Sequence, residues 1–352
     1  MLGVWRLQLL RELSRRGSIK AAAEAMEITP SAVSQQLAVL EREAGVALLE
    51  KSGRRVRLTD AGLRLVRHAD IITGAIAAAE ADLASMQQLV TGTLRVAAFP
   101  TAARAVMPAV MTALSRRHPE LRVTLRDLEA DESLTALQND EIDIAIVDDY
   151  GDGSRVTDPG LEVCEFMRDL IYLATANGGA ATATETPGIA RPSAADAVSP
   201  TQRTPPSRAS RLGGEARLEE FRDAFWIMDT DNSHLSRVVL QACRRLGFEP
   251  HIRSSCKDFS VIIALVEAGL GVGVLPGLAL LDRPVRARVR PIAPPLARRI
   301  SSVIRPERRS HPMIVSALAE LERFGGSYVP ELGGAGEQSR HPHSISATSK
   351  AH

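Results

Sequence analysis

Small polar side chains gather on one face of a helix that the sequence predicts to begin at Pro30. Thr29 before it is a typical helix N-cap residue, and proline is well tolerated in the first helical turn. Apolar residues recur at helical spacing on the opposite face. The polar face near the helix start consists of Thr29, Ser31, Ser34 and Gln35. Short donors and acceptors at a helix N-terminus can contact phosphates or base edges, although a merely solvated amphipathic helix would show the same pattern.

A cluster of cations follows this helix and favours the nucleic-acid interpretation. Residues 47–58 have the pattern of two short strands around a turn at 52–53, and the basic residues Lys51, Arg54 and Arg55 lie beside that turn. A hairpin of this kind can grip the phosphate backbone of DNA. Residues 1–67 contain 12 Lys/Arg and 7 Asp/Glu, a charge of +5, whereas the whole chain carries +1. A basic head on an acidic body indicates a polyanionic partner.

Two further helices are expected before Thr29, so a small helical unit would hold these side chains in place. The first spans about residues 5–15 and stops at Gly17, and the second, 19–25, is capped by Ser18. The second helix is short and rich in alanine, which lets another helix cross it closely. Three helices and a hairpin within residues 1–59 predict a winged helix-turn-helix, and Ser18 is included among its expected DNA contacts.

A long helix is predicted for residues 60–90, with Thr59 as its N-cap. Apolar residues recur along it at alternating steps of four and three, which is the pattern of a coiled-coil seam. The seam is expected to consist of Leu65, Ala69, Ile72, Ile76, Leu83 and Met86. Pairing with a second copy of the chain would bury this stripe and place two heads on dyad-related half-sites. The alternative is that the helix packs on domains of its own chain.

Residues 91–324 are expected to form an α/β domain of two units. The first unit alternates strands near 93–99, 121–126 and 142–147 with helices near 103–117 and 132–138, an order that implies a parallel sheet. In the second unit, strands are expected near 161–166, 170–174, 224–228 and 249–254, and helices over 233–246 and 259–268. The glycine-rich run 269–276 is not followed by Gly-Lys-Ser/Thr, so it does not predict a phosphate-binding loop. Residues 177–214 and 325–352 lack apolar periodicity and are expected to be a flexible insertion and a disordered tail.

Ligands of α/β domains bind beyond the carboxyl ends of the strands, which in this sequence correspond to three short loops. The predicted pocket residues are Pro100, Thr101, Ala102, Asp148, Asp149, Asp229, Thr230 and Asp231, with Phe259 or Pro276 nearby. The acids favour a ligand with an amine or guanidinium group, unless they are simply solvated or, as at Asp231, cap a following helix. Arg104 would instead suit a carboxylate. An amino acid would satisfy both.

Several short motifs of the head together resemble those of LysR-type transcriptional regulators. They are Gly17-Ser18, Ala21-Ala22, the run from Thr29 to Leu37, Leu40-Glu41, Gly45 and the run from Leu58 to Gly62. The chain departs from the family pattern at Leu49, where phenylalanine is usual, and at Lys51, where arginine is usual. The resemblance implies a dimerising linker helix, a two-lobed effector domain similar to periplasmic solute-binding proteins, and DNA binding controlled by a small molecule. A homodimer and a homotetramer are both consistent with it.

The sequence argues against an enzyme, because no nucleophile with a nearby base and no cluster of metal ligands is visible. The eight histidines are scattered, and Cys164, Cys243 and Cys256 form no Cys-x-x-Cys pair. No catalytic residue, metal site or cofactor is therefore expected. No apolar run is long enough for a membrane span and no leader is evident, so a cytoplasmic protein is expected. The remaining alternatives are a transport-type solute-binding protein, which the basic head argues against, and an architectural DNA-binding protein without an effector.

Overall fold

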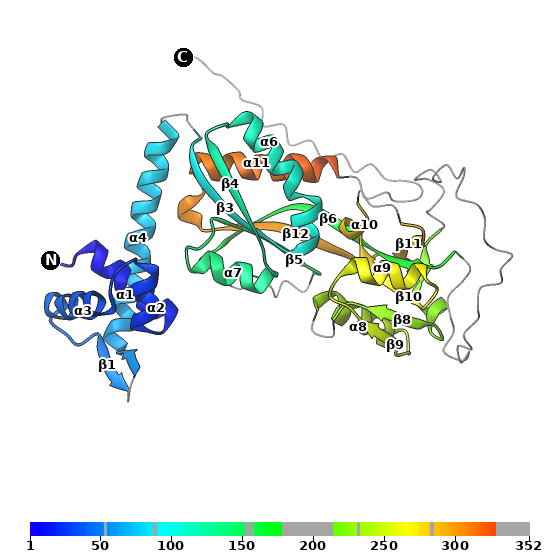
Figure 1. The fold of residues 1–352 in the computed structure, drawn as a ribbon, viewed down its shortest axis with the longest axis horizontal. Coiled ribbons are helices and arrows are strands. Elements are labelled where there is room, and N and C mark those ends of the chain that lie inside the picture. The colour runs from blue at the N-terminus through cyan, green and yellow to red at the C-terminus, as the bar shows by residue number, and fades with distance from the viewer. Residues whose placement is uncertain are drawn as a thin grey trace, which may run out of the picture.

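The computed structural model describes residues 1–52, 55–86, 90–151, 156, 158–177, 214–230, 233–281 and 285–328. Within them the chain forms a helical head, a long helix α4 (Asp60–Met86) and a larger α/β domain (Figure 1). Most of the predicted insertion and of the predicted tail lies outside the described residues, as do Arg54, Asp231 and the side chains of Lys51, Arg55 and Met86.

The helices of the head begin and end at residues suited to those positions. Helix α1 (Val4–Arg16) ends at Gly17, whose φ of +69° is one that glycine adopts without strain. The exposed Ser18 caps α2 (Ile19–Ala25), and Thr29 caps α3 (Pro30–Ala44), each by accepting a hydrogen bond from a backbone N–H. The strands β1 (Leu49–Ser52) and β2 (Arg55–Leu58) pair antiparallel. The structure thus confirms the predicted winged helix-turn-helix.

The predicted seam of α4 is divided between the chain's own head and solvent. Ala69 is fully buried in the core of the head, and Leu65 and Ile72 pack against the same core. These three residues cover the apolar face of α1, so they are not available to a partner, as the alternative interpretation had it. In contrast, Ile76 is 37% exposed and Leu83 is 64% exposed. The expectation of one continuous seam is corrected to a shorter exposed stripe that includes these two residues.

The first lobe of the larger domain contains three parallel strands covered by helices. Strand β3 (Gly92–Ala98) lies between β4 (Leu121–Asp127) and β5 (Ile144–Asp149), as the alternating order predicted. The helices are α5 (Pro100–Ala105), α6 (Met107–Arg117), α7 (Ala130–Gln138) and α11 (Pro312–Ser327). The single helix expected over 103–117 is two helices that meet at Val106, because Pro108 lacks an N–H and suits the first turn of a new helix. Residues 100–102, expected in a loop, form the first turn of α5.

The second lobe is built around strand β8 (Phe225–Met228), which pairs in parallel with β9 (His251–Ser255) and β10 (Val272–Pro276). Helices α8 (His234–Arg245) and α9 (Phe259–Glu267) connect these strands, and α10 (Gly277–Leu280) follows β10. The short strand β7 (Ala216–Arg217), the 3-10 helix η2 (Leu218–Phe221) and β11 (Arg288–Ala293) lie on the other side of the lobe. Trp226 is fully buried in the core of this lobe, which is separate from the core of the first lobe. Each lobe therefore has its own apolar core.

Two antiparallel strands join the lobes. The first half of β6 (Glu162–Thr175) pairs with β12 (Ala297–Ile304), and its second half pairs with β10 and β11. The two strands expected near 161–166 and 170–174 are therefore one strand, because the chain continues from one lobe into the other without a turn. Strand β12 also pairs antiparallel with β5, so the described strands form one mixed ten-stranded sheet.

Helix α11 corrects the predicted start of the tail, because it includes Gly325 and Gly326. A Cβ atom on Gly325 would lie 1.8 Å from the carbonyl oxygen of Phe166, so glycine at this position allows α11 to approach β6 closely. The short 3-10 helix η3 (Pro306–Arg308) precedes α11 and contacts α4. The larger domain is thus in contact with the linker helix as well as connected to it.

Candidate functional site

The N-terminal end of α3 presents the small polar side chains that the sequence analysis selected. Thr29, Ser31, Ser34 and Gln35 are all exposed. The Thr29 hydroxyl lies 3.0 Å from Ser31 Oγ, and Ser34 Oγ donates to the Pro30 carbonyl at 3.0 Å. These hydrogen bonds hold the short side chains against the helix. The start of α3 is therefore a low polar surface, which suits close approach to a DNA groove.

The hairpin is fastened to α3 by a carboxylate that the sequence analysis did not select as functional. Glu41 Oε1 accepts hydrogen bonds from the backbone N–H groups of Leu48 and Leu49, at 2.9 and 3.0 Å. The strands that carry Lys51 and Arg55 are thereby held in a defined position beside α3. Contact between these cations and DNA phosphates stays a prediction.

A cavity of about 910 Å³ opens at the junction of the two lobes of the larger domain. Five of the eight predicted pocket residues line it, namely Pro100, Thr101, Asp148, Asp229 and Thr230. Phe259 also lines the cavity, whereas Pro276 does not. Three segments that are far apart in the sequence are therefore brought together as the strand order predicted.

Two predicted pocket residues point elsewhere. Ala102 is buried in the apolar core of the first lobe, because the first turn of α5 directs it inward. Asp149 pairs with Arg299 on β12 instead of facing the cavity. Neighbouring residues of a strand lie on opposite faces of the sheet, so Asp148 and Asp149 could not both line one pocket. Asp231 lies outside the described residues.

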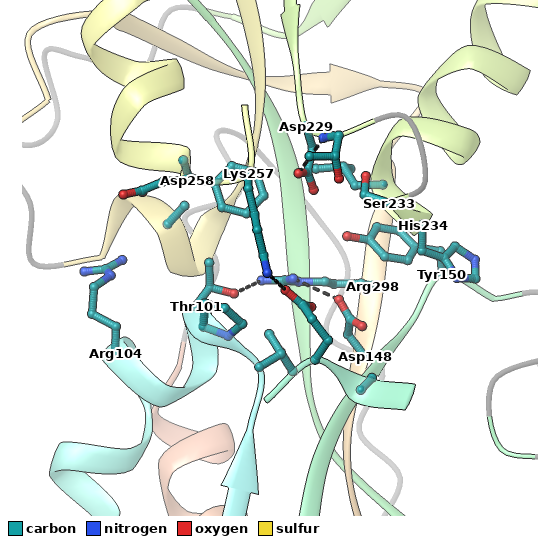
Figure 2. Close-up of a pocket in the computed structure, with 18 of the residues that line it drawn as sticks. Thr101, Arg104, Asp148, Tyr150, Asp229, Ser233, His234, Lys257, Asp258 and Arg298 are labelled. Carbon is teal, nitrogen blue, oxygen red and sulfur yellow. Dashed lines mark hydrogen bonds and ion pairs between the residues drawn. The ribbon is translucent and has the colours of Figure 1, made fainter. Parts of the chain in front are cut away.

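Arg298 forms the floor of the pocket and was not predicted from the sequence. Its Nε and Nη2 atoms donate to Asp169 Oδ2 at 2.9 and 2.8 Å, and its Nη1 donates to Asp148 Oδ2 at 3.0 Å. Figure 2 shows the guanidinium between Thr101 and Asp148, and Nη2 also donates to Thr101 Oγ1 at 2.9 Å. Burial alone would lower the pKa of Arg298, but Tyr150, Asp169 and Asp148 raise it above its ordinary value. Arg298 and Asp169 are register partners on β12 and β6, so this ion pair lies where the chain passes between the lobes.

The walls of the pocket combine acidic and aromatic side chains. Asp229 lies directly after β8, and its burial raises the pKa of its carboxyl above the usual range. The rings of Tyr150 and His234 stack with centroids 5.1 Å apart, and Figure 2 shows them side by side. Glu129 of the first lobe and Lys257 of the second lobe approach each other to 3.8 Å. Both lobes thus contribute charged groups to the same cavity.

Arg104, the expected carboxylate-binding residue, is engaged by the main chain. It lines the pocket, but its guanidinium donates to the backbone carbonyls of Leu278 and Leu281. The described lining contains five carboxylates and three cations. The pocket therefore has a net negative charge, and two of its cations, Arg298 and Lys257, already lie beside carboxylates of the protein.

Sequence signals for the missed residues were weak. Arg298 is a charged residue in a strand of alternating apolar residues, which is a pattern that can mark a buried ion pair. Tyr150 directly follows a predicted pocket residue, and His234 stands in the first turn of a predicted helix. None of these features identifies a partner across the cleft.

Metal and membrane sites were also searched for in the described part of the chain. No group of three or more His, Cys, Asp and Glu side chains there could hold a metal ion. Among the helices that the structure describes, none has both the length and the apolar character needed to cross a membrane.

Comparison with known proteins matches both parts of the chain. Residues 5–63 match the bacterial regulatory helix-turn-helix protein, lysR family, and residues 87–191 and 204–324 match the LysR substrate binding domain. The transcriptional dual regulator GltC of Bacillus subtilis (strain 168) is 24% identical over 329 residues, which cover 90% of this chain and 98% of GltC. A probable RuBisCO transcriptional regulator of Chlorokybus atmophyticus is 33% identical over 141 residues, which are 40% of this chain and only 45% of that protein.

Solved structures share the fold over nearly the whole chain. Full-length OxyR from Pseudomonas aeruginosa superposes with a TM-score of 0.60 at 20% identity, covering 93% of this chain and 95% of that one. A mutant OxyR from Corynebacterium glutamicum, H2O2-bound, gives 0.52 at 20% identity, with 92% of each chain covered. The similarities therefore extend over the head, the linker helix and the two-lobed domain.

Proposed function

Because the chain belongs to the LysR family of bacterial transcriptional regulators, we propose that its interlobe pocket binds a small amine that alters how the head binds operator DNA. Members of this family are regulators and not enzymes, so the pocket is interpreted as a regulatory site. The observation that carries the proposal is a cavity of about 910 Å³ with net negative charge in the same chain as a helix-turn-helix. A cavity of this size suits a small metabolite.

The partners of the pocket charges favour an amine over a dicarboxylate. Arg298 is held by two carboxylates, whereas Asp229 receives its hydrogen bonds from neutral groups. These are the backbone N–H of Thr230, at 2.7 Å, and the hydroxyl of Ser233. A carboxylate that is buried without a close cation is costly. An ammonium group on the ligand would supply the missing opposite charge.

The aromatic side chains of the pocket are consistent with the same ligand class. The stacked rings of Tyr150 and His234 lie on the side of the pocket that includes Ser233, and Phe259 is also in the lining (Figure 2). Aromatic faces attract cations such as ammonium and guanidinium groups. An amino acid is also accommodated in this proposal, with its ammonium at Asp229 and its carboxylate towards Lys257.

The head is proposed to bind DNA as part of a dimer or tetramer. The α3 residues Thr29, Ser31, Ser34 and Gln35 would contact base edges or adjacent phosphates, and Ser18, Lys51, Arg54 and Arg55 would contact the backbone. The exposed Ile76 and Leu83 on α4 would pack against a second copy. Two heads related by a dyad would then meet two half-sites of an operator, and the protein is expected to act in the cytoplasm with the chromosome.

Isothermal titration calorimetry of the full-length protein tests the ligand class. The probes are putrescine, L-arginine and succinate, and the variants are Asp229→Asn in the pocket and Asp223→Asn on the exposed surface of the same lobe. We expect an amine to bind, and Asp229→Asn to weaken it about tenfold or more, a change of about 1.4 kcal/mol. Asp223→Asn should leave the affinity unchanged.

Tighter binding of succinate than of either amine, or an equal loss in both variants, would overturn the amine proposal. An architectural DNA-binding protein, the alternative, would bind DNA without a response to any of the three probes.

A further inference from the structure

We propose that helix α7 connects the pocket to the DNA-binding head of the same chain, through an ionic latch in which Asp140 holds Arg11 and Arg15. The identity of the pocket's occupant rests on the proposed function, but the connection itself does not. Figure 1 shows α7 on the side of the larger domain that faces α1 and α2. One end of α7 lines the pocket and the other end leads to Asp140, so a single element reaches both sites.

The latch consists of one carboxylate of the larger domain and two arginines of the head. Arg15 Nη1 lies 2.8 Å from Asp140 Oδ2, and Arg11 donates to the same oxygen. Arg11 Nε also lies 2.9 Å from Asp70 Oδ1 on the linker helix, and Arg15 lies 3.4 Å from that oxygen. Two carboxylates from two different parts of the chain therefore clamp the same pair of arginines on α1.

Asp140 is held firmly on the first lobe. Its other carboxylate oxygen lies 2.7 Å from Nη1 of Arg305, a largely buried residue that also donates to the carbonyls of Leu137 and Ile142. Burial alone would raise the pKa of Asp140, but Arg305, Arg11 and Arg15 outweigh it and lower the pKa. The backbone of Asp140 has a φ of +58°, a conformation that residues other than glycine rarely adopt. Such a position persists where the surrounding contacts stabilise it.

The pocket end of α7 is tied to the opposite lobe. Glu129 caps α7 in a capping box with Glu132, and both Glu129 and Ala130 line the pocket. Lys257 of the second lobe lies 3.8 Å from Glu129 Oε1, and Figure 2 shows Lys257 extending across the cavity. A change in the separation of the lobes therefore acts directly on the first residue of this helix.

The helix between these ends is short and packed, so it transmits displacement. Its nine residues span about 13 Å at 1.5 Å per residue. Ser133, Ala136 and Leu137 are buried against the first lobe. A rigid helix moved at its pocket end also moves at Asp140, and packed interfaces respond by switching between discrete arrangements. Closure of the lobes would thus favour either the latched or the released head.

Hydrogen–deuterium exchange of the full-length protein, without ligand or DNA, tests the connection. At the latch the variants are Asp140→Asn and Asp140→Gly, and glycine relieves the backbone strain while removing the carboxylate. The matched control is Asp158→Asn, because Asp158 accepts a hydrogen bond from Gln138 at the same end of α7 but does not contact the head. We expect both latch variants to accelerate exchange of the α1 amides about fivefold, and the control to leave it unchanged.

The pocket end is tested with Glu129→Gln, alone and combined with Asp140→Asn. We expect Glu129→Gln alone to accelerate α1 exchange about twofold, and to have no further effect once the latch is broken. Unchanged α1 exchange in both Asp140 variants would refute the latch, and a Glu129→Gln effect that is absent or additive would refute transmission through α7. Because no effector is used, either result can be distinguished from failure of the amine proposal.

Discussion

Replacement of Arg298 by methionine is expected to destabilise the two-lobed domain strongly. The Arg298 side chain is 3% exposed, and the carboxylates of Asp169 and Asp148 that it holds are 0% and 12% exposed. Methionine would fill part of the space but leave the buried Asp169 carboxylate without its cation. Removal of one partner of a buried ion pair typically costs about 3–5 kcal/mol. For a domain of this size, that corresponds to a fall in Tm of roughly 10 °C.

Tryptophan fluorescence during urea unfolding measures this loss. The chain has two tryptophans, so a Trp5→Phe background leaves only Trp226, which is buried in the second lobe. Arg168→Met is the control, because Arg168 on the same strand as Asp169 is 72% exposed and pairs with Glu165 at the surface. Exposed pairs contribute only about 0–1 kcal/mol.

The double variant Arg298→Met with Asp169→Asn should be less destabilised than the sum of the single variants, by about 0.5–3 kcal/mol. An equal and small loss in Arg298→Met and Arg168→Met would refute the account of the pocket floor.

Three further predictions concern DNA binding, pH and assembly. Arg54→Ala with Arg55→Ala should weaken binding to all DNA sequences and lower the slope of log K against log salt by about 0.9 per lost phosphate contact, which salt titrations with specific and scrambled DNA will measure; an unchanged slope would contradict the hairpin assignment. The pKa of Asp229 is raised in the folded protein, so it favours the folded state most at pH values below its unfolded pKa, and that contribution is lost as the pH rises through the folded pKa. Asp229→Asn should therefore raise the Tm at pH 7 and not at pH 3; an equal shift at both pH values would argue against burial as the cause. Ile76→Glu with Leu83→Glu should shift the protein to monomer in analytical ultracentrifugation, and an unaltered mass would exclude this stripe from the subunit interface.

Features governed by local chemistry were predictable from the sequence. Thr29 and Pro30 identify the start of α3, and Gly17 and Gly45 end helices because each adopts a positive φ. The alternation of strands and helices predicted the parallel arrangement of β3, β4 and β5, and hence which chain segments meet at the pocket. These signals lie within a few residues of the feature that they specify.

Features that depend on distant partners were not predictable in this way. Asp169 and Arg298 are 129 residues apart, and the sequence has no signal that joins them. Helical periodicity identified Ala69 as part of an apolar stripe but could not say that α1 of the same chain covers it. Asp148 and Asp149 were both assigned to the pocket, although strand geometry allows only one of them to face it.

Fluorescence anisotropy on DNA tests the central claim most directly, namely that a small amine in the pocket controls sequence-specific binding by the head. The DNA is a fragment from upstream of the protein's own gene, with a scrambled fragment for comparison, and the probe is whichever of putrescine and L-arginine binds in calorimetry. The account predicts a preference of about a hundredfold or more for the upstream fragment. It also predicts that saturating amine changes this affinity at least about fivefold in the wild-type protein and not in Asp229→Asn. Equal weak binding to both fragments, or an affinity that does not change when the pocket is saturated, would contradict it.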